Sequence, residues 1–296
     1  MKRFSLYTIA IGLFAMTGSA FAADMPLLTK APPPPVWSWT GFYVGGNVGY
    51  SWASNSTTMT NTTTTSLTRI DDADTPNPIF TPLGTTVGPA ATGSGNLGLP
   101  GWLGGIQGGY NWQINSLVLG LEGDIQANGE SGSTTLCDTA GCPIGSGIGT
   151  ETLKMPWFGT LRVRVGYTPA ARWLVYATGG LAVAEIKDSL TEGPVGGGAG
   201  GTSINLDTTR AGYAVGGGVE TAITDHWSLK LEYLYMNFGT VSGTGTGSPA
   251  TTTTGNCAFC APPRILESIT TQTTTGISTR VSDNIVRVGV NYRFGP

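Results

Sequence analysis

The chain has 296 residues, of which 40% are hydrophobic and only 11% are charged, and its formal net charge is -3. A soluble domain usually has about 25% charged residues, so this composition is poor in the side chains that keep a surface in water. The weak net charge gives no reason to expect nucleic acid as a partner, and the 46 glycines follow no Gly-X-Y period, which excludes a collagen. A single histidine, His226, leaves little scope for zinc or catalytic-triad chemistry.

The first 22 residues indicate a secretory signal peptide. Lys2 and Arg3 precede a mostly apolar stretch, and residues 20–22 form an A-x-A cleavage site. The apolar stretch is shorter than the roughly 20 residues that a membrane-spanning helix needs, and no later run is longer. We therefore expect an exported protein without a transmembrane helix. Residues 23–38 contain a run of prolines and are expected to form an extended periplasmic tether.

Eight later segments alternate between apolar residues and polar or small residues with a period of two, which predicts strands with two unlike faces. They are residues 40–53, 101–113, 117–126, 153–167, 173–184, 208–221, 227–238 and 282–294. The rest of the chain offers no core against which so many apolar faces could pack. We therefore expect these faces to contact lipid.

The first and last of these segments show the pattern most clearly. In the first, the apolar row begins at Phe42 and ends at Trp52, so aromatic residues stand at both ends, as in the interfacial girdles of membrane barrels. In the last, a row of valines leads to Tyr292 and Phe294. The segment 173–184 is the least clear, because Leu174 and Tyr176 fit the outward row almost as well as their neighbours. In the segment 153–167, Lys154 falls on the predicted inward row.

The connections between these segments alternate long and short. Residues 55–99 lack sustained alternation and are rich in Thr, Asn, Pro and Gly, so we interpret them as a surface loop. Residues 127–152, 185–207 and 239–281 are interpreted as three further loops. Bacterial outer-membrane barrels have this asymmetry. We therefore predict that residues 39–296 form an all-β fold, an eight-stranded antiparallel up-and-down transmembrane β-barrel with short periplasmic turns and four long extracellular loops.

Five of the segments also resemble a known family. They are W-T-G-F-Y-V-G-G-N-V-G-Y at 39–50, L-R-V-R-V-G-Y at 161–167, Y-A-T-G-G-L-A at 176–182, L-K-L-E-Y-L-Y at 229–235 and V-G-V-N-Y-R-F at 288–294. Together they resemble small alphaproteobacterial outer-membrane β-barrel proteins, which include porin-like surface antigens and are similar in fold to the OmpA membrane domain. The resemblance covers the eight predicted strands and none of the long loops.

The resemblance implies a multi-pass protein of the Gram-negative outer membrane after signal-peptide cleavage. Its implied partners are outer-membrane lipid, lipopolysaccharide and, during insertion, the barrel assembly machinery. Tyr292 and Phe294 match the C-terminal signal that this machinery reads. The family typically ends on an aromatic residue, whereas here Gly295 and Pro296 follow Phe294, so we expect the signal to be read two residues inward.

The charged residues on the inward rows are the main candidate site. The bases are Arg162, Arg164, Arg210, Lys230, Arg287 and Arg293, and the acids are Glu122, Asp124, Glu220 and Glu232. An eight-stranded barrel is just wide enough to be filled by side chains. Charges in such a lumen must be paired or hydrated, because burying an unpaired charge costs several kcal/mol. We expect a salt-bridged plug; the alternative is a narrow, gated lumen that conducts ions.

The four cysteines fall in two of the predicted loops, Cys137 and Cys142 in one, Cys257 and Cys260 in the other. An even number of cysteines in an exported chain favours disulfides, and four cysteines allow three pairings. We favour one local pair in each loop, since each would close only a small ring. A redox-active C-x-x-C at Cys257 and Cys260 is the alternative, but no thioredoxin-like βαβ pattern surrounds it.

The first functional hypothesis is a structural surface protein of the outer membrane, with adhesion to a host or neighbouring cell through its loops. The alternative is a small porin that conducts ions or small solutes. A third hypothesis, an enzyme that trims lipid A, would need a base near the outer leaflet. His226 falls instead in a predicted periplasmic turn beside Asp225. We expect no enzyme, no cofactor and no metal, and the oligomeric state stays open.

Overall fold

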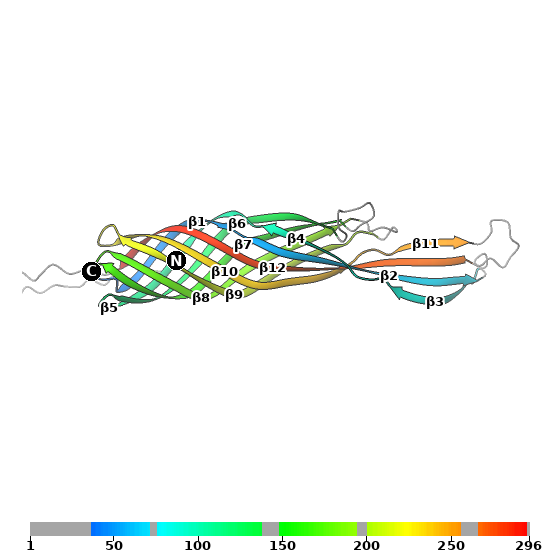
Figure 1. The fold of residues 1–296 in the computed structure, drawn as a ribbon, viewed down its shortest axis with the longest axis horizontal. Helices are drawn as coiled ribbons and strands as arrows, with labels where there is room; N and C mark the ends of the chain where they lie inside the picture. Colours follow the sequence, from blue (N-terminus) through cyan, green and yellow to red (C-terminus); the bar gives the residue numbers. More distant parts are fainter. Residues whose placement is uncertain (1–36, 72–75, 138–147, 194–199, 256–265, 295–296) are drawn as a thin grey trace, which may run out of the picture. The chain divides into compact units, whose positions relative to one another are not determined.

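The computed structural model describes residues 37–71, 76–137, 148–193, 200–255 and 266–294. The signal peptide and nearly all of the tether lie outside these residues. The described residues form an all-β fold in which every strand pairing is antiparallel (Figure 1). Among them, no helix has the length and apolar content needed to cross a membrane.

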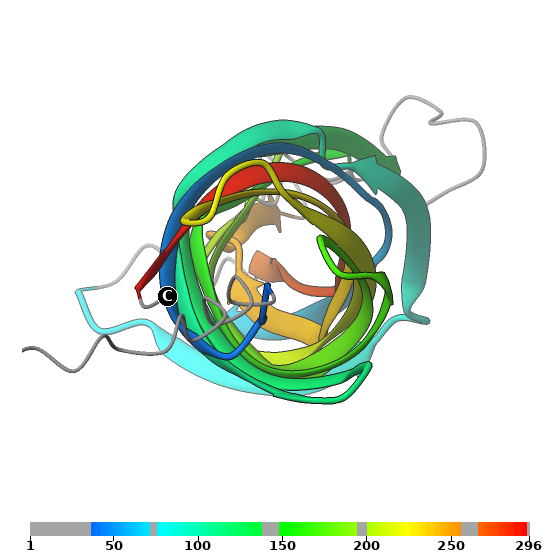
Figure 2. The same ribbon diagram turned by 90° about the vertical axis from the view of Figure 1, so that its left-hand side faces the viewer.

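The described chain contains twelve strands rather than the eight predicted. They are β1 (Gly41–Trp52), β2 (Ser54–Asp71), β3 (Ile79–Val87), β4 (Ala91–Gly98), β5 (Gly101–Ile114), β6 (Leu117–Cys137), β7 (Ile148–Ala170), β8 (Trp173–Glu192), β9 (Ser203–Ala222), β10 (Trp227–Thr246), β11 (Ala250–Gly255) and β12 (Leu266–Phe294). Eight of them pair in the cyclic order β1-β5-β6-β7-β8-β9-β10-β12, and β12 pairs back to β1 from Phe42 opposite Phe294 to Trp52 opposite Asn284. Figure 2 shows the resulting ring.

The interpretation of residues 55–99 as a loop without strands was wrong. This stretch forms β2, β3 and β4, and β2 pairs with the first half of β12 from Thr57 opposite Thr279 to Ile70 opposite Leu266. Both partners are rich in threonine, whose branched side chain favours extended backbone. The period-two test missed them because a strand with similar side chains on both faces shows no alternation.

Most ring strands also extend well beyond their predicted ends. β6 continues to Cys137, β8 to Glu192, and β12 begins at Leu266. Three ring connections are short: Ile114 to Leu117, Ala170 to Trp173, and Ala222 to Trp227. We call the end of the ring with these connections the turn end and the opposite end the loop end. Asn115 takes φ 56° in the first turn, a left-handed conformation that asparagine tolerates.

The outward face carries the apolar rows predicted from the sequence. Phe42, Trp102, Leu161 and Val288 are all exposed, at 65%, 74%, 54% and 43%. In β8 the ambiguity is resolved, because Leu174 is fully buried while its neighbours on either side are exposed. An apolar outer face over a polar interior is the arrangement of a membrane barrel.

One predicted facing was wrong. Lys154 was expected inside the ring but is exposed. The register of β7 against β8 shifts between Lys154 and Phe158, where β7 carries one extra residue. Because side chains alternate with a period of two, a single inserted residue moves every later side chain to the other face. β10 has a similar irregularity at Gly239, whose φ of +76° suits glycine.

Candidate functional site

The interior of the ring is built in layers, and the inward-facing residues of β8 give their order. From the turn end, Leu174 and Tyr176 come first, then small residues, then Ala184 and Ile186, and finally Asp188. These four successive groups of residues mark four successive layers of the interior. We name them, from the turn end, the aromatic layer, the ionic layer, the apolar layer and the acidic layer.

The ionic layer is centred on Glu122 of β6. Its carboxylate lies 2.6 Å from Arg162 Nη2 and 3.1 Å from Lys230 Nζ. Arg287 Nη2 lies 3.7 Å away and Arg164 Nη1 3.9 Å away. Four strands (β6, β7, β10 and β12) therefore meet at one carboxylate. Each of these side chains is at most 2% exposed.

Three further carboxylates complete the layer. Glu232 lies 2.5 Å from Arg287 and 3.2 Å from Arg162. Asp124 lies 2.9 Å from Arg162 and 3.1 Å from Arg287. Glu220 lies 3.2 Å from Arg164. Four carboxylates thus face four cations (Arg162, Arg164, Lys230 and Arg287), so the layer is balanced in charge.

Neutral donors satisfy the remaining carboxylate oxygens. Tyr43 Oη donates to Glu122 at 2.7 Å and Tyr176 Oη donates to Glu232 at 2.8 Å. Ser228 and Asn291 donate to Glu220 at 2.5 and 2.8 Å. A buried ion pair is tolerated only when such additional hydrogen bonds offset its desolvation. The carboxylates of the layer meet that condition, whereas Nη1 of Arg162 and Nη1 of Arg287 are buried without a hydrogen-bond partner.

Two of the predicted network residues lie outside the ionic layer. Arg210 of β9 makes no ion pair among the described residues, and its Nε is buried without a hydrogen-bond partner. Arg293 donates to the backbone oxygens of Ser38 and Thr40 instead of to a carboxylate. The alternation predicted that Arg210 and Arg293 point into the ring, but the register of the strands decides which charged side chains come into contact. Arg293 and Arg210 stand at strand positions on either side of the layer.

The aromatic layer fills the turn end. Trp39 is fully buried, and its backbone N–H donates to Gln113 at 2.6 Å. The guanidinium of Arg293 lies 4.3 Å from the Trp37 ring centroid and 5.7 Å from that of Trp39. Cations over indole faces are attracted by the ring quadrupole. The residues just before β1, which were assigned to the tether and the edge of the first strand, therefore help to fill the ring at this end.

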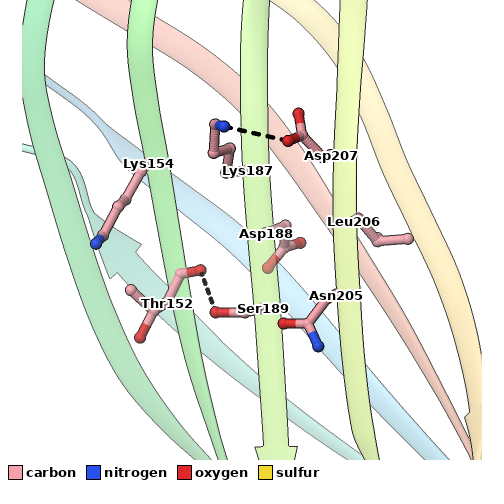
Figure 3. A pocket seen from close by; sticks show the side chains of 8 residues that line it. All are labelled: Thr152, Lys154, Lys187, Asp188, Ser189, Asn205, Leu206 and Asp207. Atoms are coloured by element: carbon pink, nitrogen blue, oxygen red, sulfur yellow. Dashed lines mark hydrogen bonds and ion pairs between the residues drawn. The ribbon is translucent and has the colours of Figure 1, made fainter.

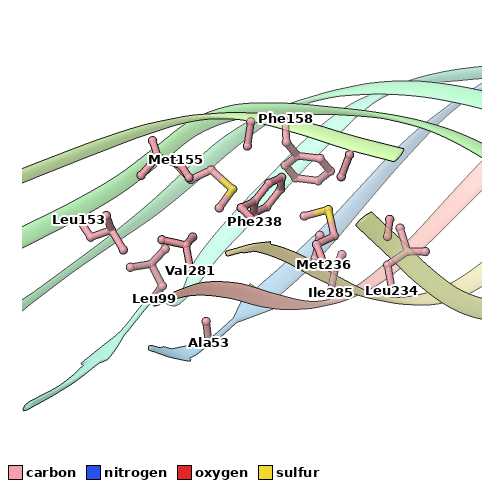
Figure 4. Packing of buried hydrophobic residues seen from close by; sticks show 14 of the residues in the cluster. Ala53, Leu99, Leu153, Met155, Phe158, Leu234, Met236, Phe238, Val281 and Ile285 are labelled. Carbon is pink, nitrogen blue, oxygen red and sulfur yellow. The ribbon is translucent and has the colours of Figure 1, made fainter. Parts of the chain in front are cut away.

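Figure 4 shows the buried cluster that we call the apolar layer. It lies on the loop side of the ionic layer, because Leu234 stands two residues nearer the loop end than Glu232 on β10. Phe158, Leu234 and Met236 are fully buried in it, and Phe238 is 4% exposed. The layer also contains Ile285 of β12, two residues before Arg287. Side chains from β7, β10 and β12 pack together here, so the interior has a second layer of buried side chains.

The acidic layer follows beyond the apolar layer. Glu151 on β7 is fully buried and Asp188 on β8 is 2% exposed. Burial and the charge of Glu151 raise the pKa of Asp188 to about 7. Burial likewise raises the pKa of Glu151. Sequence reasoning missed this layer because its residues fell in predicted loops, although the alternation I-K-D-S-L-T-E at 186–192 is visible.

A cavity of about 400 Å³ lies on β7, β8 and β9 near the loop end (Figure 3). Thr152, Lys154, Ser189 and Asn205 are among its lining residues. Lys187 at its rim lies 3.1 Å from Asp207. The cavity begins just past the last exposed apolar residue of β8, Val183. Among the described residues, no group of three or more His, Cys, Asp or Glu side chains could hold a metal.

The other predicted sites are only partly described. Cys137, at the end of β6, is disulfide-bonded. Cys142, Cys257 and Cys260 lie outside the described residues. Tyr292 packs against Trp227 and Phe294 at the turn end, with ring centroids 5.1 and 5.2 Å apart.

His226 is exposed in the short turn between β9 and β10. Its ring stacks on Tyr292 with the centroids 5.7 Å apart. The nearest ion pair in this region joins Arg172 and Asp225, which are both exposed.

Comparison with known proteins finds outer-membrane proteins by both family and sequence similarity. Residues 9–294 match the family described as outer membrane protein beta-barrel domain. The chain is 32% identical over 300 residues to the 31 kDa outer-membrane immunogenic protein of Brucella melitensis, covering 99% of this chain and 100% of the relative. It is 33% identical over 130 residues to the 22 kDa outer membrane protein of Rhizobium leguminosarum, covering 44% and 49% of the two chains.

One similar solved structure is a distant relative by sequence. The outer membrane protein OprG from Pseudomonas aeruginosa matches 87% of this chain and 97% of its own chain, with 11% identity and a TM-score of 0.39.

Proposed function

Because this chain belongs to the outer membrane protein beta-barrel domain family and is an outer-membrane protein, we propose that it is a closed structural barrel with a surface-exposed, antigen-like loop end. The relative from Brucella melitensis is named an immunogenic protein, which supports exposure at the cell surface. The finer parts of the proposal concern the spanning strands, the closure of the lumen and the partners.

The part of the eight-stranded ring that carries the outward apolar rows is the membrane-spanning part in this proposal, and Glu151 and Asp188 lie beyond it toward the loop end. Its outward apolar row runs from Phe42 to Trp52 on β1 and from Val286 to Phe294 on β12. Rows of this length suit tilted strands that cross an apolar band of ~25 Å. The turn end lies in the periplasm and the loop end outside the cell, because barrels of this kind have short periplasmic turns.

Closure of the lumen is supported by one observation above all: two independent layers fill the ring. The ionic layer has no surplus charge and its side chains are at most 3% exposed. The apolar layer beyond it is equally buried. A porin lumen instead needs a continuous polar path in which an ion keeps its hydration or finds substitutes for it. Closure therefore favours the structural role over the porin.

We expect no single-channel steps when the refolded full-length protein is inserted in planar bilayers. A general porin refolded in the same way serves as the positive control. The variant Phe158→Ala/Phe238→Ala, which truncates the apolar layer alone, should also stay silent, because the ionic layer still fills the ring. Reproducible steps from the wild type would contradict the proposal and favour the porin. Steps from the variant alone would assign closure to the apolar layer.

The loop end supports contact with other molecules. The sheet β3-β2-β12-β11 extends from the ring, and Phe80, Leu83 and Val87 of β3 are 62%, 53% and 65% exposed. β3 pairs with β2 only, within the described residues, so one edge of it is open. Exposed apolar edge strands are uncommon unless they meet a partner. This favours adhesion to a cell-surface ligand as the finer function of the loop end.

Placing the loop end outside the cell also suggests which membrane components the barrel contacts. The cavity of Figure 3 begins where the apolar row of β8 ends, and Lys154 is exposed at it without an ion pair in the described chain. A base just beyond the apolar row, on the loop side, is placed to bind the phosphates of lipopolysaccharide. The second membrane partner in this proposal is the barrel assembly machinery. Tyr292 and Phe294 at the end of β12 are the residues proposed to engage it during insertion.

A further inference from the structure

Two carboxylates meet inside the acidic layer without a counter-ion. Glu151 comes from β7 and Asp188 from the neighbouring strand β8. Thr279 of β12 donates to Glu151 Oε1 at 2.7 Å, and Thr57 of β2 lies 2.9 Å from Thr279 Oγ1. Four strands thus contribute to one polar cluster, and all four side chains are at most 2% exposed.

No base compensates this pair within the described residues. Lys187, the next residue to Asp188, points to the outer face and pairs with Glu185 and Asp207 at 2.9 and 3.1 Å. Lys154 is exposed on the same outer face. Arg210, the nearest inward-facing base, stands opposite Ala184 on β8, four residues before Asp188.

Three carboxylate oxygens of the cluster have no hydrogen-bond partner. Both carboxylate oxygens of Asp188 and Oε2 of Glu151 are buried and have no hydrogen-bond partner. A buried charged oxygen without a partner is destabilising, so the folded protein requires a positive species there. Three oxygens, two negative charges and an adjoining hydroxyl are what a hard divalent cation binds; no sulfur or nitrogen ligand is present in the cluster.

We propose that Glu151 and Asp188 bind a divalent cation of the calcium class inside the loop end of the ring. Thr279 Oγ1 and water complete its shell. Calcium fits better than magnesium, because it accepts six to eight oxygens in irregular geometry and magnesium demands a regular octahedron. The ion balances the two carboxylates and ties β7 and β8 to β12 across the interior, which stabilises the part of the ring beyond the apolar layer.

The test uses the refolded full-length protein in detergent micelles free of lipopolysaccharide, which would itself bind calcium. Equilibrium dialysis at pH 8 should detect bound calcium on the wild-type chain, and the variants below count the ion that belongs to Glu151 and Asp188. Calcium should also shift the unfolding equilibrium in urea, by about 100-fold at a concentration 100 times the dissociation constant. No bound calcium on the wild type would overturn the proposal.

Substitutions of the two carboxylates test whether the calcium ion binds at this cluster. Glu151→Gln/Asp188→Asn should bind one calcium ion fewer than the wild type, yet unfold at higher urea than the wild type in EDTA, because two unpartnered charges are gone. The matched outer-face control, Glu185→Gln/Asp207→Asn, should respond to calcium as the wild type does. If the inner variant fails to refold, Asp188→Asn alone should weaken calcium binding at least tenfold. Unchanged calcium binding in the inner variant would overturn the assignment.

A proton is the competing occupant. Because the pKa of Asp188 is raised to about 7, the folded state binds more protons than the unfolded state between pH 4 and pH 7. With a proton alone, stability would fall as the pH rises through this window, and calcium would not restore it at pH 8. That result would overturn the proposal in favour of a shared proton.

Discussion

Replacing Arg287 by methionine should lower the free energy of unfolding by about 3–5 kcal/mol. Arg287 is fully buried and lies within 3.1 Å of both Glu232 and Asp124, so its removal leaves carboxylates in the ionic layer without compensation. Urea unfolding of the refolded protein in lipid vesicles, followed by tryptophan fluorescence and by gel mobility without boiling, measures the loss.

Two controls isolate the charge imbalance from the lost packing. Arg172→Met removes an exposed ion pair with Asp225 and should change stability by less than about 1 kcal/mol. Arg287→Met/Glu232→Gln removes one charge of each sign and should recover part of the loss. A cost for Arg287→Met no larger than for Arg172→Met would show that the ionic layer is hydrated instead of sealed.

Replacing Val288 by arginine should destabilise the inserted protein by about 2–4 kcal/mol. Val288 lies opposite Val48 of β1 and Leu231 of β10, near the middle of the outward apolar row. A charge there must be buried in lipid or must deform the bilayer to reach water. Insertion into preformed vesicles, measured as the urea midpoint and the folded fraction, reports the cost.

The matched control is Ser278→Arg on the same strand. Ser278 is outward-facing and exposed but lies ten residues nearer the loop end, beside the natural exposed Arg280. We expect a change of about 0–1 kcal/mol there. Equal insertion of the Val288 and Ser278 variants would show that the apolar row of β12 does not contact lipid.

The ring strands could be predicted because their two faces differ. From Val286 to Phe294 every second residue is apolar, which sets both the strand and its facing before any partner is known. The threonine-rich β2 and the first half of β12 carry no such contrast, so alternation could not find them. Their pairing depends on contacts between residues more than 200 positions apart, such as Thr57 and Thr279.

The ionic layer was predictable in composition but not in pairing. Alternation places Glu122 and Arg287 on the inward face, whereas their separation of 3.7 Å depends on the register of the whole ring. The same limit explains why Arg210 and Arg293 were grouped with residues that they do not reach. Lys154 shows a second limit, because one extra residue in β7 reverses the facing. The signal in that segment was Pro156, a residue type that strands tolerate mainly at edges and bulges, but alternation alone does not use it.

The central claim is that the outer face of the ring contacts lipid while the charged side chains are sealed inside. Spin labels at Val163 and Val290, two outward residues that are 55% and 40% exposed, test it most directly in reconstituted vesicles. Both labels should collide more often with dissolved oxygen than with a water-soluble nickel complex. More frequent collisions with nickel at these two positions would contradict the account.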